Sequence, residues 1–336
     1  MAEAGVPPGA DRSSPGGVAN KIVVAGSILV DRIHAIDAYP VAGELAQVRS
    51  VARIAGGLVP NTGRDLKLLD PGLEVLAAGS VGDDPDGAFV RGELAACGLE
   101  LALTVSPSEA TSFTNVMSVP GGERTFFTFP GASASWGYDD FPFDRVNAGD
   151  IVLLGYFLLL AKVDAGDGLR ILKELRRRGV RTAIDLVTEN SDRYGLVRDC
   201  LPWVDYLIVN EIEAARIAGR EADSPELAEA LIESGVGQCV IIHEPTKGTL
   251  LRRGGTCIEL PSFTLPEGFV VDKTGAGDAY CAGVLTGLAR GVDDCEILRR
   301  GRLAAIGALS GAGATAGVRE LGELARWASK VLAPAE

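Results

Sequence analysis

The sequence predicts a doubly wound α/β domain, in which a mostly parallel β-sheet carries helices on both faces. Short apolar runs alternate with segments of helical periodicity from residue 21 to residue 243, and the connections are long enough for crossover helices. Strands joined in this way run parallel and are covered on both faces. Two stretches rich in β-forming residues, 36–57 and 99–130, interrupt the alternation. They predict hairpins of a small separate sheet that covers a cleft as a lid.

The strands and helices are expected in a regular order. The first strand is the apolar run KIVVAG at 21–26, whose final glycine is typical of a strand that ends at a site. Further strands are expected at 73–79, 150–155, 180–186, 205–210 and 238–243, and helices around 60–70, 85–97, 165–179, 211–219 and 225–234. After Val270 two helices rich in alanine and glycine follow, the second at roughly 293–312, and we expect them to pack closely.

Composition limits the classes of function. The 336 residues include 32 basic and 45 acidic side chains, and the formal charge of −13 argues against a general nucleic-acid or anionic-membrane surface. No run of 18 apolar residues occurs, and six scattered cysteines are typical of reduced thiols in a cytoplasmic protein. Two histidines are too few for a His-rich zinc site. Residues 1–20 are small, polar and proline-rich, and we expect a disordered leader before a domain at 21–336.

The strongest functional signal is the string D-K-T-G-A-G-D at 272–278. Gly275 and Gly277, with Ala276 between them, allow a tight turn whose backbone N–H groups point outward, and the following helix adds the positive end of its dipole. Such a loop binds anions such as the phosphates of a nucleotide. Asp278 would lie beside that anion, where a carboxylate can take a proton from an attacking hydroxyl. The structural alternative is that the glycines only end and begin helices, with Asp278 as a cap.

The longer string D-K-T-G-A-G-D-A-Y-C-A-G, which starts at Asp272, resembles the C-terminal signature of the ribokinase-like (PfkB-type) carbohydrate kinases. The resemblance implies a three-layer α/β/α fold with a β lid. It also implies that the backbone of Gly275, Ala276 and Gly277 forms an anion hole for the transferred phosphoryl group, and that Asp278 is the general base for a sugar hydroxyl. Other motifs continue the resemblance in the family's order over roughly residues 21–320.

Two of these motifs belong to the expected sugar site. G-S-I-L-V-D at 26–31 is similar to the strand-one signature whose aspartate, here Asp31, holds sugar hydroxyls. G-G-L-V-P-N at 56–61 resembles the motif at the return from lid to core, so the resemblance implies that Gly56, Gly57 and Asn61 line the substrate. Taken alone, Asp31 could cap a strand end and the two glycines could form a hinge.

The third motif is N-E-I-E at 210–213, which fits the N-x-x-E pattern associated in the family with magnesium and phosphate. Asn210 and Glu213 are therefore expected to hold Mg²⁺, mainly through water, since this ion keeps several water ligands. The same spacing is that of a helix-capping box, and one arrangement can serve both purposes.

Some segments depart from the family pattern. The string H-E-P-T-K-G at 243–248 keeps only the last glycine of the usual T-x-G-x-x-G. The resemblance implies nucleotide binding by His243, Thr246 and Gly248, together with Thr274, and the departure leaves the identity of the phosphoryl donor open.

Two basic residues near these motifs have competing interpretations. Lys273 is interpreted as a solvated surface residue. Arg124 is a candidate to reach the substrate from the lid, with a solvated edge charge as the alternative.

The sequence thus predicts an ATP- and Mg²⁺-dependent kinase acting on a hydroxyl of a small carbohydrate, with any monovalent-cation requirement left open. A nucleoside kinase of the same fold is the first alternative, and Phe113, Phe127 or Trp136 could supply its slot for the base. The second alternative is a non-catalytic sugar-binding relative, which the altered 243–248 segment suggests. No nucleic-acid or membrane partner is expected, and the lid is a candidate homodimer surface.

Overall fold

The structure is a computed structural model that describes residues 19, 21–120, 124–188 and 192–332. The leader expected at 1–20 lies outside the described residues except for Ala19, which is buried and donates a backbone hydrogen bond to Ala289. Residues 121–123, which belong to the expected lid segment 99–130, also lie outside them.

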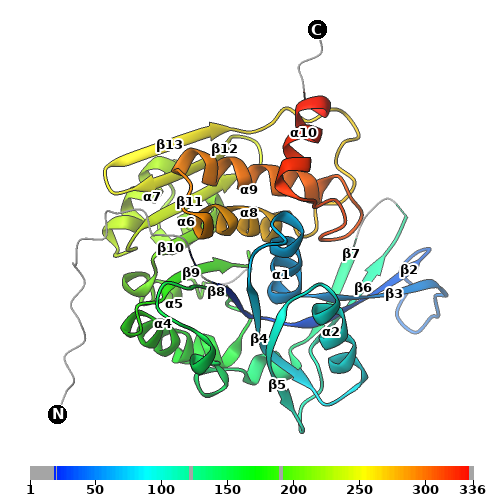
Figure 1. Cartoon of the computed structure of the whole chain (residues 1–336). Coiled ribbons are helices and arrows are strands. Elements are labelled where there is room, and N and C mark those ends of the chain that lie inside the picture. Colours follow the sequence, from blue (N-terminus) through cyan, green and yellow to red (C-terminus); the bar gives the residue numbers. More distant parts are fainter. Residues whose placement is uncertain (1–18, 20, 121–123, 189–191, 333–336) are drawn as a thin grey trace.

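The main sheet contains nine strands within the described residues, in the order β13-β12-β11-β10-β9-β8-β1-β4-β5 (Figure 1). The strands from β5 to β11 in this order pair in parallel, whereas β12 and β13 add an antiparallel hairpin at one edge. Their bounds are β1 (Ile22–Gly26), β4 (Val75–Gly82), β5 (Glu100–Ser106), β8 (Ile151–Phe157), β9 (Arg181–Leu186), β10 (Tyr206–Asn210), β11 (Cys239–Glu244), β12 (Gly248–Arg253) and β13 (Thr256–Pro261). The predicted mostly parallel sheet is confirmed.

Helices cover both faces of this sheet and give two separate hydrophobic cores. Alternate residues of β1 divide between them: Ile22 and Val24 belong to one core, and Val23 and Ala25 to the other. The first core packs against α1 (Leu58–Leu69), α2 (Pro85–Ala96), α8 (Ala276–Arg290), α9 (Asp294–Leu309) and α10 (Leu321–Val331). The second packs against α4 (Gly168–Arg177), α5 (Gly195–Arg198), α6 (Glu211–Ala218) and α7 (Ser224–Glu233). A short α3 (Gly131–Ser135) precedes β8. The three-layer prediction is thereby confirmed.

In the part of the chain that the structure describes, a second sheet has four strands in the order β3-β2-β6-β7 and projects from one side of the molecule (Figure 1). Its strands are β2 (Leu29–Ile36), β3 (Val48–Gly56), β6 (Phe113–Ser118) and β7 (Arg124–Phe129), and we call it the lid. The expected second lid segment at 99–130 needs correction, because β5 pairs in parallel with β4 in the main sheet. As a half-buried edge strand, β5 lacks the continuous apolar run by which the inner strands were predicted. The lid also begins earlier than expected, at Leu29.

The carboxyl ends of five parallel strands bring polar residues to one edge of the main sheet. Gly26 of β1 pairs with Gly155 of β8, which in turn pairs with Asp185 of β9, and Asn210 of β10 pairs with His243 of β11. In open α/β sheets ligands bind at this edge. Among the described residues, no helix is both long and apolar enough to cross a bilayer.

Candidate active site

The Gly-rich string forms the N-terminus of α8. Gly275 has φ 75°, and a Cβ at this position would lie 2.6 Å from both the Cβ and the carbonyl oxygen of Ala314, so only glycine fits. Gly277 instead borders open space, with no atom within 4 Å of the point where a Cβ would lie. As at any helix start, the first N–H groups of α8 have no partner within the helix, and the helix dipole adds positive charge there. The loop is therefore suited to an anion.

Asp278 is buried in the first turn of α8, and two side chains from other elements contact it. Asn61 of α1 donates from Nδ2 to Oδ2 at 2.9 Å, and the Tyr156 hydroxyl donates to Oδ1 at 2.9 Å and to Oδ2 at 3.0 Å. Burial raises the pKa of Asp278, the two hydrogen bonds oppose the rise, and the resulting value is about 6. A carboxyl with this pKa is largely ionised at neutral pH and still able to accept a proton.

Sequence reasoning missed Tyr156, which reaches Asp278 because β8 is irregular. The pairing between β8 and β9 shifts between Gly155 and Phe157, and Tyr156 adopts φ 59°, a rare conformation for a bulky residue. The extra residue directs the phenol toward α8. Burial, followed by the charges of Asp278, Asp185 and Asp31, raises the pKa of Tyr156, so it stays a hydrogen-bond donor.

The predicted sugar-binding residues gather on the lid side of this pair. Gly56 lies directly against Asp31, because a Cβ on Gly56 would lie 2.1 Å from the Asp31 Oδ2. Burial raises the pKa of Asp31 to about 6. Gly57 precedes α1 with φ 89°, packed against Ser27, and Asn61 follows one turn later. The charge of Asp31 acts on Tyr156, so these residues and Asp278 share one neighbourhood.

A second buried acid, Asp65, also went unnoticed in the sequence. It lies one turn beyond Asn61 on α1 with 0% exposure, and neither carboxylate oxygen has a hydrogen-bond partner in the described part of the chain. Burial and then the charge of Asp278 raise its pKa well above the usual range, against a smaller opposite effect of Arg64. Ionisation of Asp65 is disfavoured because it would place two buried carboxylates close together.

A polar cavity of about 190 Å³ opens in front of α8. It is lined by Tyr156, Asp185, Leu186, Val187, Thr188, Asn210, Glu213, His243, Lys273, Gly275, Ala276, Gly277 and Asp278. The predicted anion loop, general base and magnesium motif therefore line one space. Lys273, interpreted from the sequence as solvated, is exposed and also lines the cavity.

Asn210 and Glu213 form the capping box of α6. The Asn210 Oδ1 accepts a hydrogen bond from the backbone N–H of Glu213 at 2.9 Å, and the Glu213 Oε2 accepts one from the backbone N–H of Asn210 at 3.1 Å. The Thr188 hydroxyl donates to the Glu213 Oε1 at 2.7 Å. Burial raises the pKa of Glu213. It also raises the pKa of Asp185, to which the charges of Glu213 and Asp278 add. These buried acids favour a cation nearby.

Asn210, Glu213 and Asp185 are the residues of this cavity that could hold a divalent cation. No three His, Cys, Asp or Glu side chains of the described residues lie close enough together to form a direct metal site. Mg²⁺ needs few protein ligands because it retains several waters, and Glu213 and Asp185 are two of the buried acids that line this space.

An apolar cavity of about 420 Å³ adjoins the polar one, and the two share His243, Lys273, Ala276 and Gly277. Its apolar wall consists of Pro245, Phe263, Leu265, Val270, Ala305, Ile306 and Leu309, with Tyr280 and Arg302 also present. The two predicted nucleotide residues His243 and Gly248 line it. Burial lowers the pKa of His243 to about 4, so this ring is neutral at pH 7.

The other two predicted nucleotide residues lie elsewhere. Thr246 is on the exposed turn between β11 and β12 and lines neither cavity. Thr274 accepts a hydrogen bond from the Arg124 Nη1 of the lid at 2.8 Å. Arg124 also bonds Asp272 at 3.0 Å, so the lid is tied to the Gly-rich string. Burial would raise the pKa of Asp272, but the bonds from the Thr274 amide and from Arg124 lower it to about 2.

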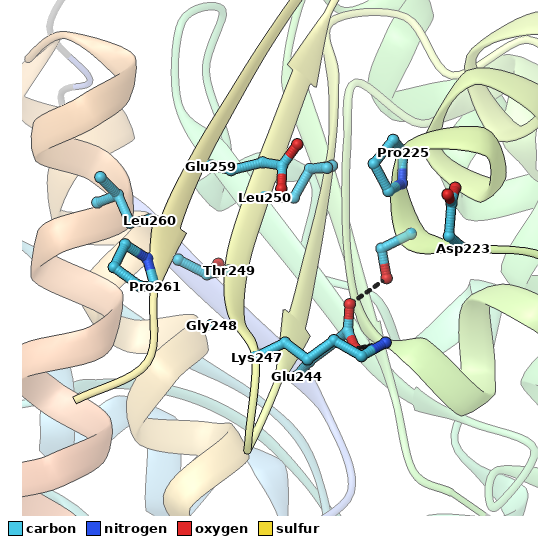
Figure 2. A pocket seen from close by; sticks show the side chains of 11 residues that line it. Asp223, Pro225, Glu244, Lys247, Gly248, Thr249, Leu250, Glu259, Leu260 and Pro261 are labelled. Carbon is cyan, nitrogen blue, oxygen red and sulfur yellow. Dashed lines mark hydrogen bonds and ion pairs between the residues drawn. The ribbon is translucent and has the colours of Figure 1, made fainter. Parts of the chain in front are cut away.

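A third cavity of about 450 Å³ lies on the other side of the β11–β12 turn, next to the start of α7 (Figure 2). Glu244 and Gly248 border both this cavity and the apolar one. Glu244 pairs with Lys247 at 2.8 Å and accepts from Ser224 at 2.6 Å. Its carboxylate is therefore engaged toward α7 (Figure 2).

The fold and site together are an α/β domain with a β lid and, at the start of α8, a loop suited to anions beside a buried carboxyl. A family model described as pfkB family carbohydrate kinase matches residues 19–320. The chain belongs to this family. It is 27% identical over 308 residues to a ribokinase of Arabidopsis thaliana, an alignment that covers 87% of this chain and 77% of the relative.

Two further comparisons agree. An adenosine kinase of Saccharomyces cerevisiae is 26% identical over 277 residues, with 80% of this chain and 81% of the relative covered. The solved structure of Arabidopsis thaliana ribokinase complexed with ribose and ATP superposes with a TM-score of 0.77 at 24% identity, over 94% of this chain and 100% of that one. The likeness to this solved structure shows a common fold.

Proposed function

We propose that this protein transfers the terminal phosphoryl group of ATP to a hydroxyl of a small carbohydrate. The observation that carries the proposal is the position of Asp278, a buried carboxyl with a pKa of about 6. It lines the polar cavity beside Ala276 and Gly277, which that cavity shares with the apolar one. The substrate oxygen attacks the terminal phosphorus, the bond to the leaving diphosphate breaks, and Asp278 takes the hydroxyl proton. The amides at the start of α8 stabilise the charge on the transferred group.

The remaining residues divide the two substrates between them. Asp31, Gly56, Gly57 and Asn61 would hold the sugar, while the apolar cavity with His243 and Gly248 would hold the nucleotide. Mg²⁺, held through water by Glu213 and Asp185, would neutralise phosphate charge when bound. The net charge of −13 makes such local attraction necessary.

The aromatic residues favour a sugar over a nucleoside as the acceptor. Trp136 is fully buried against Phe141 and supplies no slot for a base, contrary to the expectation from sequence. Phe113 stacks on Phe129 and under Arg32, and strand alternation directs it to the face of the lid opposite Asp31. Phe127 lies on that same opposite face. The adenosine kinase relative keeps the nucleoside alternative in the assay below.

The test is a panel of acceptors with ATP and Mg²⁺, read as ADP production, with ribose, fructose and other hexoses against adenosine, inosine and cytidine. The panel is repeated with K⁺ and with Na⁺. We expect turnover with a sugar, and Asp278→Asn should lower kcat by roughly 10²–10⁴ while the protein stays folded.

The matched control is Asp144→Asn, an exposed carboxylate away from both cavities, which should change nothing. Near-wild-type turnover of Asp278→Asn would reject the assigned base. Sugar binding in calorimetry without any ADP release would favour the non-catalytic alternative.

We further propose a cytoplasmic location and a homodimer formed through the lid. The first is supported by the need for ATP and by six cysteines that are all unpaired in the structure. The second is supported by the exposed apolar side chains of the lid, and its experiment is described with the whole molecule below.

A further inference from the structure

Arg302 of α9 is a half-buried cation in the wall of the apolar cavity, and it contacts an aromatic ring there. Its Nε is buried and makes no hydrogen bond, and none of the residues that the structure describes forms an ion pair with it. Its guanidinium lies 4.0 Å from the ring centre of Phe263. Burial lowers the pKa of this group. A cation held by a ring contact keeps its N–H donors available to a ligand that supplies acceptors.

Other polar groups that border the same cavity are already engaged. The Glu244 carboxylate binds Ser224 and Lys247 on the side of α7 (Figure 2). The Tyr280 hydroxyl is bonded to Thr249. His243 is neutral and packs on Tyr280 with ring centres 4.7 Å apart. Two charged donors, Lys273 and Arg302, therefore remain available to a ligand, and Lys273 belongs to the Gly-rich string at the phosphate end of the cavity.

The position of Arg302 along α9 separates it from the phosphate end. The chain just before the Gly-rich loop is fixed to the end of α9 by the bond from the Val271 amide to the Leu309 carbonyl. Arg302 lies seven residues earlier, about 10 Å along the helix axis. Side chains on a helix point back toward its N-terminus, which moves the guanidinium farther from the loop. It is thus placed to contact the base of a nucleotide whose phosphates lie at Gly277.

A guanidinium can only donate hydrogen bonds. Guanine and hypoxanthine present two adjacent acceptors, N7 and O6, whereas adenine presents N7 beside the N6 amino donor. Two N–H groups of Arg302 can donate to N7 and O6 of guanine or hypoxanthine. Against adenine, one of them would face the N6 amino group, which is also a donor.

We propose that the phosphoryl donor site prefers a 6-oxopurine nucleoside triphosphate, GTP or ITP, over ATP, with Arg302 as the selectivity residue. The proposal rests on the proposed kinase function and changes only the preferred base.

The experiment compares kcat/KM for ATP, GTP, ITP and CTP with the full chain, Mg²⁺ and a saturating acceptor. We expect GTP and ITP to exceed ATP by roughly 5- to 100-fold, the range for one bidentate arginine contact. Arg302→Gln should reverse the ratio in favour of ATP, because an amide both donates and accepts and so matches N6 and N7 of adenine. Arg302→Met should make the kcat/KM values for ATP, GTP and ITP similar. Arg299→Gln is the control, since Arg299 pairs with Glu296 and does not line this cavity, and its ratio should equal that of the wild type.

A second readout needs no turnover: the rise in unfolding temperature on adding GDP or ADP to each variant. Preference for ATP and ADP in the wild type, unchanged by Arg302→Gln, would overturn the proposal and leave the kinase assignment intact. Failure of every triphosphate to support turnover would count against the kinase function, while the diphosphate comparison would still decide on Arg302.

Discussion

Tyr156 and Asp278 form the central residue pair of the site. The phenol donates to both oxygens of the carboxylate, and it can do so because Tyr156 occupies a left-handed backbone conformation at a bulge. A conformation of this kind costs of order 1–3 kcal/mol and persists where the surroundings require it. The hydrogen bond stabilises the ionised form of Asp278 and so opposes the effect of burial.

Tyr156→Phe is expected to move the acid limb of the pH–rate profile. A general base works only when deprotonated, so kcat rises with pH through the pKa of Asp278, about 6. Without the phenol the pKa rises further, and the midpoint should move up by roughly 0.5–1 pH unit. The loss of kcat is then roughly 2- to 5-fold at pH 6 and smaller at pH 8.5.

Tyr138→Phe is the matched control, because Tyr138 packs on Phe143 and Arg170 outside both cavities. Its profile should coincide with that of the wild type. An unchanged midpoint in Tyr156→Phe would mean that the phenol does not tune the base.

At the scale of elements, the lid is attached to the core by few polar contacts. Arg124 at the start of β7 reaches Asp272 and Thr274, which belong to the string before α8. On the far side of the lid, Arg32 and Arg53 contact Asp86 of α2. The Arg124 contact is special because it connects the lid directly with the proposed anion loop.

Arg124→Ala is therefore expected to loosen closure over the substrate. The KM for the acceptor should rise about 10-fold, and ATP hydrolysis without acceptor should increase several-fold, since a closed lid excludes water. Asp272→Asn should give a similar effect, and the double variant should be no worse than either one, as expected for coupled residues.

Arg49→Ala serves as the control for that measurement, because this exposed lid arginine pairs with Asp37 inside the lid. It should leave KM and background hydrolysis unchanged. Additive effects of Arg124→Ala and Asp272→Asn would contradict a shared contact.

The helices and strands also show which parts of the fold could be predicted from the sequence. Apolar runs bounded by turns predicted the inner strands well, because burial on both faces leaves a direct mark on composition. β5 was placed in the lid because an edge strand is only half-buried and its pattern does not reveal its partner. The position of Asp278 at a helix start followed from the glycines.

The contacts made by Asp278 were harder to predict. Asn61, which donates a hydrogen bond to it, lies 217 positions away in the chain, and only a family motif indicated that Asn61 belongs to the site. Tyr156 and Asp65 carried no signal, since a strand bulge and a buried unpaired carboxyl are set by tertiary packing.

For the whole molecule, exposed apolar side chains concentrate on the lid. More than half of the large hydrophobic residues exposed in the described residues lie on the lid strands or in the loop that joins β2 to β3: Tyr39, Val41, Leu45, Val48, Val51, Phe126, Phe127 and Phe129. The strand register puts Phe127 and Val51 on the face opposite Asp31, with exposures of 56% and 62%. Exposed apolar patches of this kind mark interaction surfaces, and two copies of one sheet face can pair about a two-fold axis.

We therefore expect sedimentation equilibrium at micromolar concentration to give a mass near twice the chain mass of 34.9 kDa. The double variant Phe127→Lys with Val51→Lys should shift the mass to that of one chain, because like charges would meet across the axis and the apolar contact would be lost. Since both side chains point away from Asp31, the melting temperature should stay within a few degrees of the wild type. Leu196→Lys, a substitution of an exposed leucine on α5 far from the lid strands in the fold, is the control and should remain a dimer. A wild-type mass of one chain at every concentration, or a double variant that still dimerises, would rule out the lid as the interface.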